Sequence, residues 1–244
     1  MCHDAEAGSY CRDRQTGELL LSLLQSTRAN LSTSLSDLVT ASRTTSAVAK
    51  HVLARLAGSG LVVLDGPMIR VPSETRLRLA LEATVAGVGL ERLCQAINAK
   101  EFEDMAAIAL RANGFGVLAR FVFRHASRRY EIDVVGTKAS TVICADCKHW
   151  RRGSSKGRLL DAVKKQIQRV EALTLELEKH ASRLKLAGDG EKCLIPVILT
   201  LADTGHRMIE RVPIVPVFTL SSFLHEFDLY LDRLRVMEWK PGGS

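Results

Sequence analysis

Apolar residues in the N-terminal part of the chain recur at the spacing of amphipathic helices. Leu19, Leu20, Leu23 and Leu24 form the first such stripe. The pattern predicts three helices. The first begins at Gly17, the second spans 34–40 and the third spans 43–56. Two short apolar runs follow, 61–64 and 68–71, and the Asp65-Gly66-Pro67 between them predicts a hairpin. Residues 16–72 are therefore predicted to form a small helical domain that ends in a hairpin.

The next segment, 73–98, keeps a helical pattern over 74–85 and 90–98. Gly87-Val88-Gly89 lies between the two runs and predicts a hinge. We interpret this segment as a helical connector that ends near Ala99.

From residue 99 onward the pattern mixes helices with short apolar strands. The predicted elements are a helix at 100–110, strands at 117–123, 130–135 and 141–147, a helix at 159–186, strands at 193–201 and 212–220, and a helix at 221–236. The nearly all-apolar run 193–201 is typical of a strand buried on both faces. The order α-β-β-β-α-β, followed by one more strand and helix, predicts an α/β domain over 99–238 with a mixed sheet.

Composition and charge narrow the class of protein. Hydrophobic residues make up 46% of the chain and aromatic residues 5%, which predicts a globular core of mainly aliphatic side chains. No apolar run approaches the roughly 20 residues that span a bilayer, and residues 1–15, a predicted flexible tail, lack the apolar centre of a signal peptide. The six cysteines show no disulfide-framework spacing, which favours a reducing, cytoplasmic location. The net charge of +7 favours a polyanionic partner.

A cluster of charged residues lies on two neighbouring predicted strands. Asp146 and Lys148 are two residues apart, so they project from the same face of their strand. Asp133 lies on the preceding strand, and the turn-like run 136–140 allows the two strands to pair as a hairpin. Two carboxylates and an ammonium are costly in an apolar setting, and a bound divalent cation would account for them. The alternative is a structural salt-bridge cluster at a sheet edge.

This arrangement resembles the metal-dependent nucleases of the PD-(D/E)XK type. Asp133, a gap of twelve residues and then Asp146-Cys147-Lys148 match their motif, although Ile132 stands where many members have proline. The run from Lys100 through Phe102 and Asp104, which leads to Asn113-Gly-Phe-Gly-Val117, resembles the first helix of Mrr-like restriction endonucleases and archaeal Holliday-junction resolvases. The resemblance covers about residues 99–220 and implies a restriction-endonuclease-like fold.

The resemblance also implies roles for individual residues. Asp133, Asp146 and the backbone carbonyl of Cys147 would bind Mg²⁺ or Mn²⁺, with Glu103 on the preceding helix completing the shell. Lys148 would orient or deprotonate the attacking water and stabilise the transition state. Gln166, or else Gln168, corresponds to a glutamine of resolvase- and exonuclease-like members. Glu101 and Asp104 are read as solvated helix charges, and Glu131 as either a supporting acid or an exposed strand residue.

The N-terminal domain resembles winged helix-turn-helix transcription regulators over about residues 17–72, above all in the run TTSAVAKHVLARLAGSGLV. That resemblance implies that Ser46, Ala47 and Lys50 face the major groove of DNA and that Lys50 or Arg55 reaches phosphates. The alternative is a small packing or dimerisation module.

A polar loop follows the charged strand and is rich in basic residues: His149, Arg151, Arg152, Lys156 and Arg158. We predict that it contacts DNA phosphates, although an ordinary solvated loop would have the same composition, and His149 is equally well a surface histidine. Cys144 and Cys147 are an odd number of residues apart on a strand and have no second ligand pair, so no zinc site is predicted. No P-loop motif is present, so no nucleotide cofactor is expected.

Taken together, the sequence predicts a cytoplasmic Mg²⁺-dependent DNA endonuclease whose winged helix aids DNA binding. Nucleases of the type it resembles usually pair to cut two strands, which implies a homodimer. Two alternatives stay open. One is a catalytically inactive DNA-binding regulator or scaffold with the same fold, and the other is an RNA-processing nuclease.

Overall fold

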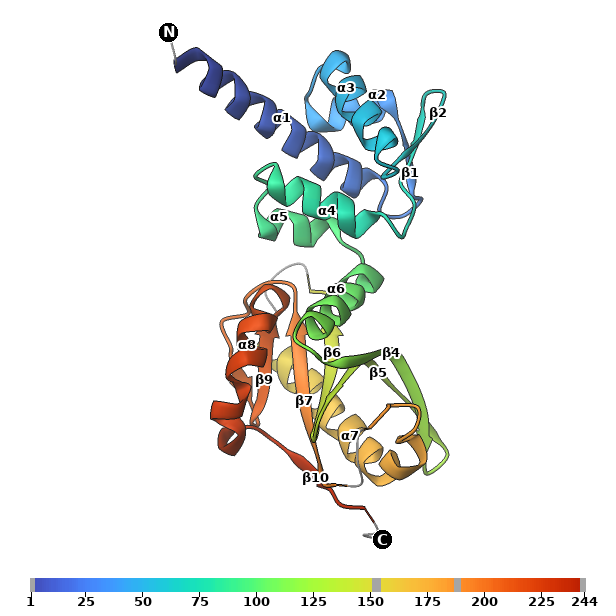
Figure 1. Cartoon of the computed structure of the whole chain (residues 1–244), viewed down its shortest axis with the longest axis vertical. Coiled ribbons are helices and arrows are strands. Elements are labelled where there is room, and N and C mark those ends of the chain that lie inside the picture. The colour runs from blue at the N-terminus through green and yellow to red at the C-terminus, as the bar shows by residue number, and fades with distance from the viewer. Residues whose placement is uncertain (1–2, 151–154, 187–189, 242–244) are drawn as a thin grey trace. The chain divides into compact units, whose positions relative to one another are not determined.

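The structure, a computed structural model, describes residues 3–150, 155–186 and 190–241, with side chains from Arg14 onward. The chain divides into two compact units, Met1–Glu101 and Phe102–Ser244, whose elements are labelled in Figure 1. The division falls within the first turn of helix α6 (Ala99–Ala112), close to the predicted boundary at Ala99. None of the helices in the described ranges is long and apolar enough to cross a membrane.

The N-terminal unit combines helices around a leucine-rich core with a small sheet. Its elements before α6 are α1 (His3–Ser26), β1 (Ser32–Ser34), α2 (Leu35–Ser42), α3 (Ser46–Gly58), β2 (Val63–Asp65), β3 (Met68–Arg70), α4 (Arg76–Val85) and α5 (Leu90–Ala96). The sheet is antiparallel, with strand order β1-β3-β2. Side chains of Ser34 and Thr45 cap α2 and α3 by accepting hydrogen bonds from backbone amides three residues later, at 3.1 and 3.3 Å.

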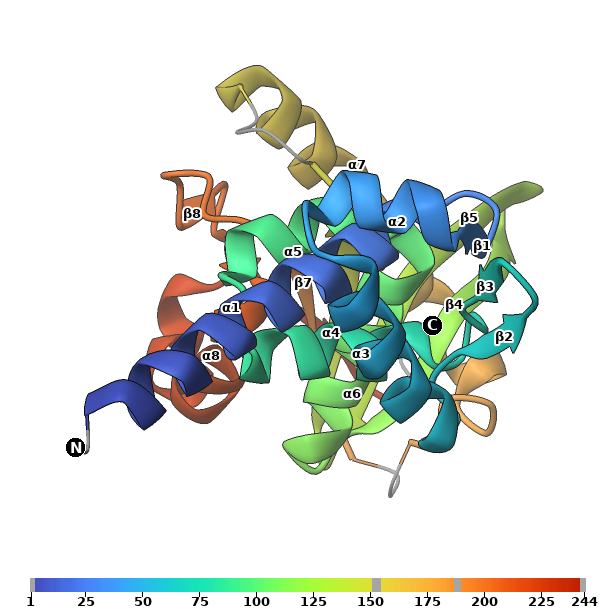
Figure 2. The same cartoon turned by 90° about the horizontal axis from the view of Figure 1, so that it is seen from above.

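Two sequence predictions for this unit need correction. A flexible tail was expected over residues 1–15, but α1 already begins at His3; Ala, Glu and Arg in that stretch have high helix propensity and no proline interrupts it. The segment 73–98 was expected to be a connector, but Leu79, Ala83 and Leu93 belong to the same buried core as the leucines of α1. The apolar stripes of α4 and α5 therefore complete this unit rather than link it to another. Helix α1 lies along α4 in both views of Figures 1 and 2.

A buried arginine closes the helical core. Arg76, at the start of α4, is fully buried and donates to Glu101, to the Thr27 hydroxyl at 2.6 Å and to the carbonyl oxygens of Leu24 and Ala96 at 3.0 and 3.3 Å. Glu101 was predicted to be a solvated helix charge, yet it is buried because it neutralises this arginine.

Glu101 has a second task, because it also starts α6. The amide of Asn98 donates to its carboxylate at 2.8 Å, and its own amide donates to the Asn98 side chain at 2.9 Å. This reciprocal pair is a capping box, which satisfies amides that the first turn of a helix leaves without partners. Asp104, the other residue predicted to be solvated, is exposed.

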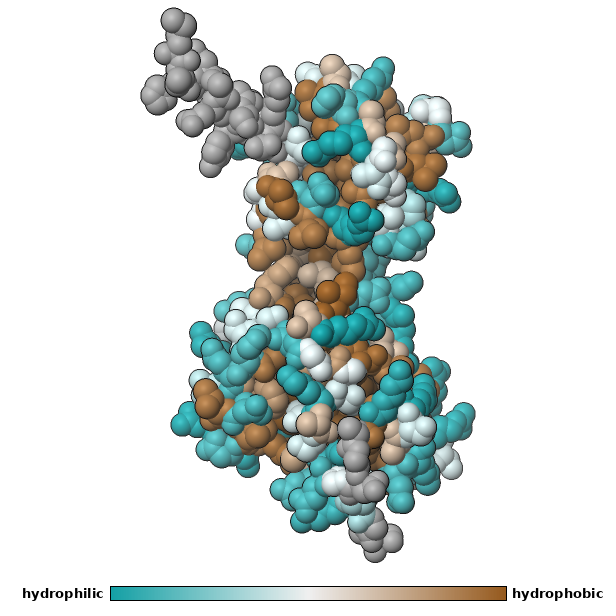
Figure 3. Space-filling view, in the orientation of Figure 1, coloured by the Kyte–Doolittle hydropathy of each residue, from teal (hydrophilic) through white to brown (hydrophobic). Residues whose placement is uncertain are grey.

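The β2–β3 hairpin exposes hydrophobic side chains. Val63, Leu64 and Met68 are each about two-fifths exposed, and Figure 3 shows hydrophobic surface over this hairpin. Gly66 turns the hairpin with a φ of +55°, in the left-handed region that glycine enters without a steric penalty. The Asp65-Gly66-Pro67 signal in the sequence therefore corresponds to a hairpin here.

The C-terminal unit is mixed α/β, as the sequence predicts. After α6 come β4 (Gly116–His125), β5 (Arg128–Lys138), β6 (Thr141–Lys148), α7 (Lys156–His180), β7 (Lys192–Thr200), β8 (Met208–Ile209), β9 (Val212–Pro216), η1 (Val217–Thr219), α8 (Leu220–Glu226), η2 (Phe227–Arg233) and β10 (Met237–Trp239). The sheet order is β4-β5-β6-β7-β9-β8, with β10 also paired to β7. β6, β7 and β9 run parallel, and the other pairings are antiparallel. Helices α6 and α7 lie on opposite sides of this sheet (Figures 1 and 2).

Element boundaries in this unit differ from the prediction in several places. β5 runs to Lys138, because the turn needs only Ala139, with a φ of 51°, and Ser140. α7 ends at His180 rather than residue 186, and the predicted helix 221–236 is divided into α8 and η2. The short strands β8 and β10 were missed because two or three residues carry no readable periodicity.

Candidate active site

The two predicted strand carboxylates, Asp133 and Asp146, lie at neighbouring positions where the pairing of β5 and β6 ends. The antiparallel register runs from Lys138↔Thr141 to Val134↔Ala145, so its next step brings Asp133 opposite Asp146. Instead of continuing the ladder, the Asp133 carboxylate accepts a hydrogen bond of 2.7 Å from the backbone amide of Cys147. The side chain of Asp133 thus closes the ladder and is fixed beside Asp146.

Placing two carboxylates together changes the acidity of Asp133. Burial, and then the adjacent charge of Asp146, raise the pKa of Asp133 to about 6, against the opposing hydrogen bond from the Cys147 amide. The charge of Glu103 adds to this shift, and that of Lys148 opposes it. The ionised pair therefore requires positive charge close by.

Two cations provide part of that charge at Asp146. Its carboxylate is only 1% exposed and contacts Lys148 Nζ at 2.7 Å through Oδ2 and Arg169 Nη1 at 2.6 Å through Oδ1. The Arg169 contact is an aligned hydrogen bond. Oδ2 accepts no aligned hydrogen bond from any described residue, so the lysine contact is one of charge alone. This buried oxygen thus lies against an ammonium group without an aligned hydrogen bond from a described residue.

Glu103 approaches this cluster from α6 but is bound to a different cation. Its carboxylate accepts a hydrogen bond of 2.8 Å from Arg120 Nε, and Arg120 also contacts Asp104 at 3.3 Å. Arg120 has a φ of 53° and interrupts the register of β4 and β5 opposite Asp133. Burial raises the pKa of Glu103. Among the described residues, no group of three or more His, Cys, Asp or Glu side chains converges closely enough to hold a metal ion, so Glu103 lies outside the carboxylate pair.

The predicted Gln166 takes a structural position. It is fully buried on α7 and donates to the carbonyl of Cys144 on β6 at 2.7 Å. The alternative, Gln168, is exposed. The residue of α7 that contacts Asp146 is Arg169, three positions after Gln166, and its guanidinium also contacts the Gln166 side chain at 3.3 Å. Arg169 was missed, although its spacing of three from Gln166 puts both on one helix face.

The cysteines of β6 behave as core residues. Cys144 is buried, and burial raises the pKa values of both Cys144 and Cys147, which keeps their thiols protonated. Cys147 contributes its backbone amide to Asp133.

Some residues of the predicted basic loop after β6 belong to the described ranges. Arg151 and Arg152 lie outside the described residues. Lys156 and Arg158 are exposed in the first turn of α7, which Ser155 caps. His149 is half-buried, with its ring 6.4 Å from that of Phe102, and Trp150 packs against the core formed by α7 and β9.

A second basic surface borders the carboxylates, and the sequence interpretation did not identify it. A groove of about 330 Å³ lies between β5 and α7. Its cationic lining residues are Arg128, Arg129, Lys165 and Arg169, with Tyr130, Glu131 and Gln168 beside them. Glu131 is exposed in this groove. Because Arg169 belongs both to the groove and to the Asp146 contact, the basic surface leads directly to the carboxylate pair.

In the N-terminal unit, α3 exposes the predicted contact residues. Ser46, Ala47, Lys50 and Arg55 are all exposed, whereas Val52 and Leu53 face the core. Ala47 and Arg55 also line a shallow groove of about 440 Å³ on this unit. The exposed face is polar with two cations, and it forms no part of the carboxylate cluster.

The fold and this cluster define a mixed α/β protein with a paired-carboxylate site, and comparison with known proteins adds a family. No established protein-family profile matches the chain. An uncharacterized protein of Archaeoglobus fulgidus is 32% identical over 133 residues, which cover 54% of this chain and 93% of that protein. The chain belongs to the same family as this archaeal protein.

Among solved structures, the crystal structure of protein VC1899 from Vibrio cholerae aligns with a TM-score of 0.36 and 14% identity. The alignment covers 92% of this chain and 56% of that one, so this chain spans little more than half the length of VC1899. At that TM-score the likeness defines neither a shared fold nor a shared function.

Proposed function

We propose that the C-terminal unit is a divalent-metal-dependent nuclease that hydrolyses phosphodiester bonds of DNA. The observation that carries this proposal is the pairing of Asp133 with Asp146 at the end of the β5–β6 ladder, with Lys148 in contact with Asp146. A structural salt bridge has no need of the second carboxylate, which burial and its neighbour make unfavourable to ionise.

The residues of this pair fit Mg²⁺ or Mn²⁺. Mg²⁺ is commonly bound by one or two carboxylates together with substrate phosphates and waters, without a complete protein cage. Asp133 and Asp146 would hold it, since Asp146 Oδ2 is a buried oxygen without an aligned hydrogen bond among the described residues. When bound, such a metal lowers the pKa of water and offsets charge on the phosphate.

The cations of the site have complementary roles in this proposal. Arg169 holds one oxygen of Asp146 in place, so the other oxygen would be the one to bind the metal. Lys148, whose side chain is 26% exposed, reaches solvent beside the carboxylates and donates to the attacking water or to a phosphate oxygen, where negative charge develops. Glu103, held by Arg120, orders water next to Asp133.

Nucleic acid is the substrate class best matched to the surrounding charge. The groove with Arg128, Arg129, Lys165 and Arg169 offers four cations against the single carboxylate of Glu131. Phosphate contacts of this kind provide most of the sequence-independent affinity for DNA. Arg169 both lines the groove and contacts Asp146, so a nucleic-acid backbone bound there would pass beside the carboxylates.

We also propose that the N-terminal unit is a winged helix-turn-helix that binds the same DNA. Its order of α1, β1, α2, α3 and the β2–β3 hairpin supports this, and Ser46, Lys50 and Arg55 are exposed on α3. α3 would occupy the major groove, with its N-terminal residues at base edges and its cations at phosphates.

One observation favours a second candidate, an inactive DNA-binding scaffold. Asp146 is contacted by both Lys148 and Arg169, so its own charge is compensated without a metal. In that case the groove would bind nucleic acid and nothing would be cleaved.

Cleavage assays separate these candidates. The full chain is incubated with supercoiled, linear and branched DNA and with RNA, in Mg²⁺, Mn²⁺ or EDTA. We expect metal-dependent DNA cleavage that Asp146→Asn lowers by about 100-fold or more, because a metal ligand is lost. Asp161→Asn, an exposed carboxylate on the same helix as Arg169, is the matched control and retains wild-type rates.

Three results would contradict the proposal. Cleavage in EDTA would exclude the metal, and equal cleavage by Asp146→Asn and wild type would place the chemistry elsewhere. Binding of every substrate without cleavage would favour the scaffold. Cleavage of RNA alone would support the proposed metal-dependent hydrolysis and show that the substrate is RNA instead of DNA.

A further inference from the structure

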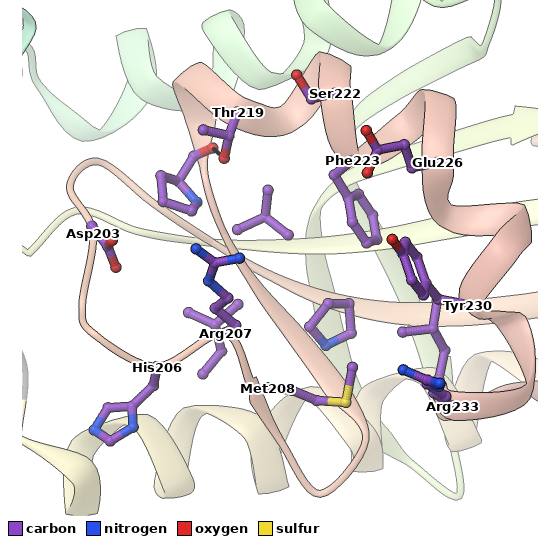
Figure 4. A pocket seen from close by; sticks show the side chains of 15 residues that line it. Asp203, His206, Arg207, Met208, Thr219, Ser222, Phe223, Glu226, Tyr230 and Arg233 are labelled. Atoms are coloured by element: carbon purple, nitrogen blue, oxygen red, sulfur yellow. Dashed lines mark hydrogen bonds between the residues drawn. The ribbon is translucent and has the colours of Figure 1, made fainter.

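A second cavity lies in the C-terminal unit, separate from the carboxylate pair. It has a volume of about 570 Å³ and is bounded by β8, β9, α8 and η2. This is within the range of pockets that hold small organic ligands. Figure 4 shows that Arg207 extends into this space from the segment before β8, while Phe223 and Tyr230 project toward it from α8 and η2.

Three of the charged residues that line this cavity have exposed side chains without a side-chain partner among the described residues. Within residues 3–150, 155–186 and 190–241, Arg207, Glu226 and Arg233 form no side-chain ion pair or hydrogen bond. By contrast, Arg120 and Arg169 of the same unit are both paired with carboxylates. A strong donor and a strong acceptor thus face one cavity without neutralising each other.

Aromatic rings line the same space. Tyr230 is 40% exposed and Phe223 is half-buried, so both offer ring surface to a ligand. Two rings, a forked donor and a carboxylate match the needs of a nucleobase, which is flat and carries acceptors and donors on its edge.

The cavity borders the same edge of the sheet as the candidate active site. β6, β7 and β9 are parallel, and the register aligns Lys148 with Thr200 and Thr200 with Pro216. Val215 and Pro216, at the carboxyl end of β9, line the cavity. Ligands of open α/β sheets bind at the carboxyl ends of strands, so both sites occupy the expected edge.

We propose that this cavity binds one unstacked nucleobase of the substrate strand. The choice of ligand rests on the nuclease function proposed above. The base stacks on Tyr230 and Phe223, Arg207 donates to its acceptors, and Glu226 accepts from its donors. Guanine satisfies both, because its O6 and N7 accept from a forked arginine and its N2 amino group donates. Arg233 lies beside Tyr230 (Figure 4), where it binds the attached phosphate.

The first test measures nucleotide binding without cleavage. The full chain in EDTA is titrated calorimetrically with dGMP, dAMP, dCMP and dTMP. We expect dGMP to bind most tightly, with a loss of roughly 5- to 150-fold in Tyr230→Ala, the range for one stacked base. Glu226→Gln should remove the preference for dGMP, and Arg207→Gln should weaken binding. Leu229→Ala and Arg111→Gln, exposed residues outside the cavity, are the controls and bind as wild type does.

The second test uses DNA with a single unpaired guanine, compared with the fully paired duplex. Wild type should bind the unpaired guanine more tightly, and Tyr230→Ala should bind both equally. Absence of binding by all four nucleotides, or binding that Tyr230→Ala and Arg207→Gln leave unchanged, overturns the inference. Neither assay requires catalysis, so a failed nuclease proposal with intact, Tyr230-dependent binding is distinguishable from the failure of this site.

Discussion

Each unit of the protein buries a carboxylate against an arginine, and the two arrangements differ in how completely they are satisfied. In the N-terminal unit, Arg76 donates to Glu101, to Thr27 and to the carbonyls of Leu24 and Ala96. Glu101 in turn accepts from a backbone amide in the capping box of α6. Both carboxylate oxygens and all three guanidinium nitrogens therefore have partners, and the group is closed to further ligands.

In the C-terminal unit, the corresponding arrangement is left open. Asp146 contacts Arg169 and Lys148, whose side chains are each 26% exposed, and one of its oxygens accepts no aligned hydrogen bond among the described residues. Asp133 lies beside it with a pKa raised to about 6 by burial and by Asp146. A fully satisfied buried ion pair serves the fold, whereas an incompletely satisfied one next to a like charge indicates a ligand.

The largest loss of stability is expected when the buried Arg76–Glu101 pair of the N-terminal unit is broken. Arg76→Met leaves Glu101 as a buried carboxylate without its cation, which costs about 3–5 kcal/mol of unfolding free energy. Hydrogen exchange measured on peptides of α1, α4 and α5 should show faster exchange throughout the N-terminal unit. Arg92→Met is the matched control: its partner is Glu18, and the two side chains are 53% and 37% exposed, so the expected loss is at most about 1 kcal/mol. Equal losses in the two variants would show that Arg76 is not the centre of this core.

The intermediate effect concerns the glutamine that holds α7 on β6. Gln166→Leu removes the donor to the buried Cys144 carbonyl and should cost about 1–3 kcal/mol, the penalty for a buried group left without a partner. Urea unfolding followed by tryptophan fluorescence is suitable, because Trp150 and Trp239 both lie in the C-terminal unit. Gln168→Leu, which alters an exposed position, provides the comparison. If Gln166→Leu abolished cleavage at unchanged stability, the residue would be catalytic after all.

The smallest effect on stability is expected for a substitution at Asp146, in the incompletely satisfied arrangement of the C-terminal unit. Asp146→Asn removes the buried charge and leaves Lys148 and Arg169, which are exposed enough to be hydrated. Asp133 also loses its like-charged neighbour. We expect the unfolding free energy to change by less than about 1 kcal/mol, measured by the same urea unfolding. A loss comparable to that of Arg76→Met would mean that both arrangements are structural, and the contrast between the units would disappear.

Short-range patterns in the sequence were sufficient for part of the site. The spacing of two between Asp146 and Lys148 predicts a shared strand face, and the two side chains are in contact. The turn after β5 predicts a hairpin, which brings Asp133 next to Asp146. These relations depend on one strand or one tight turn, so local periodicity fixes them.

Contacts between a helix and the sheet, or between two helices, could not be predicted from local sequence patterns. Arg169 reaches Asp146 because α7 is docked on β6 at one particular rotation, which the helical pattern alone does not specify. Arg76 is buried, whereas Arg78, two residues later on the same helix, is exposed. The composition of the helix does not indicate which of the two arginines is buried. The basic groove was missed for the same reason, since its residues come from β5 and α7, which are separate in sequence.

The alignment of Lys148, Thr200 and Pro216 across three parallel strands has a consequence for how specificity can change. β7 lies between β6, which carries Asp146 and Lys148, and β9, which lines the Arg207 cavity, so the two strand ends are two inter-strand distances apart, roughly 10 Å. Substitutions in the loops after β6 and β9 can alter which group each strand end recognises, but they do not change the distance between the two strand ends. Under the proposed nuclease and base-binding functions, variants of these loops should therefore change the base that is bound and leave its distance from the cleaved bond unchanged.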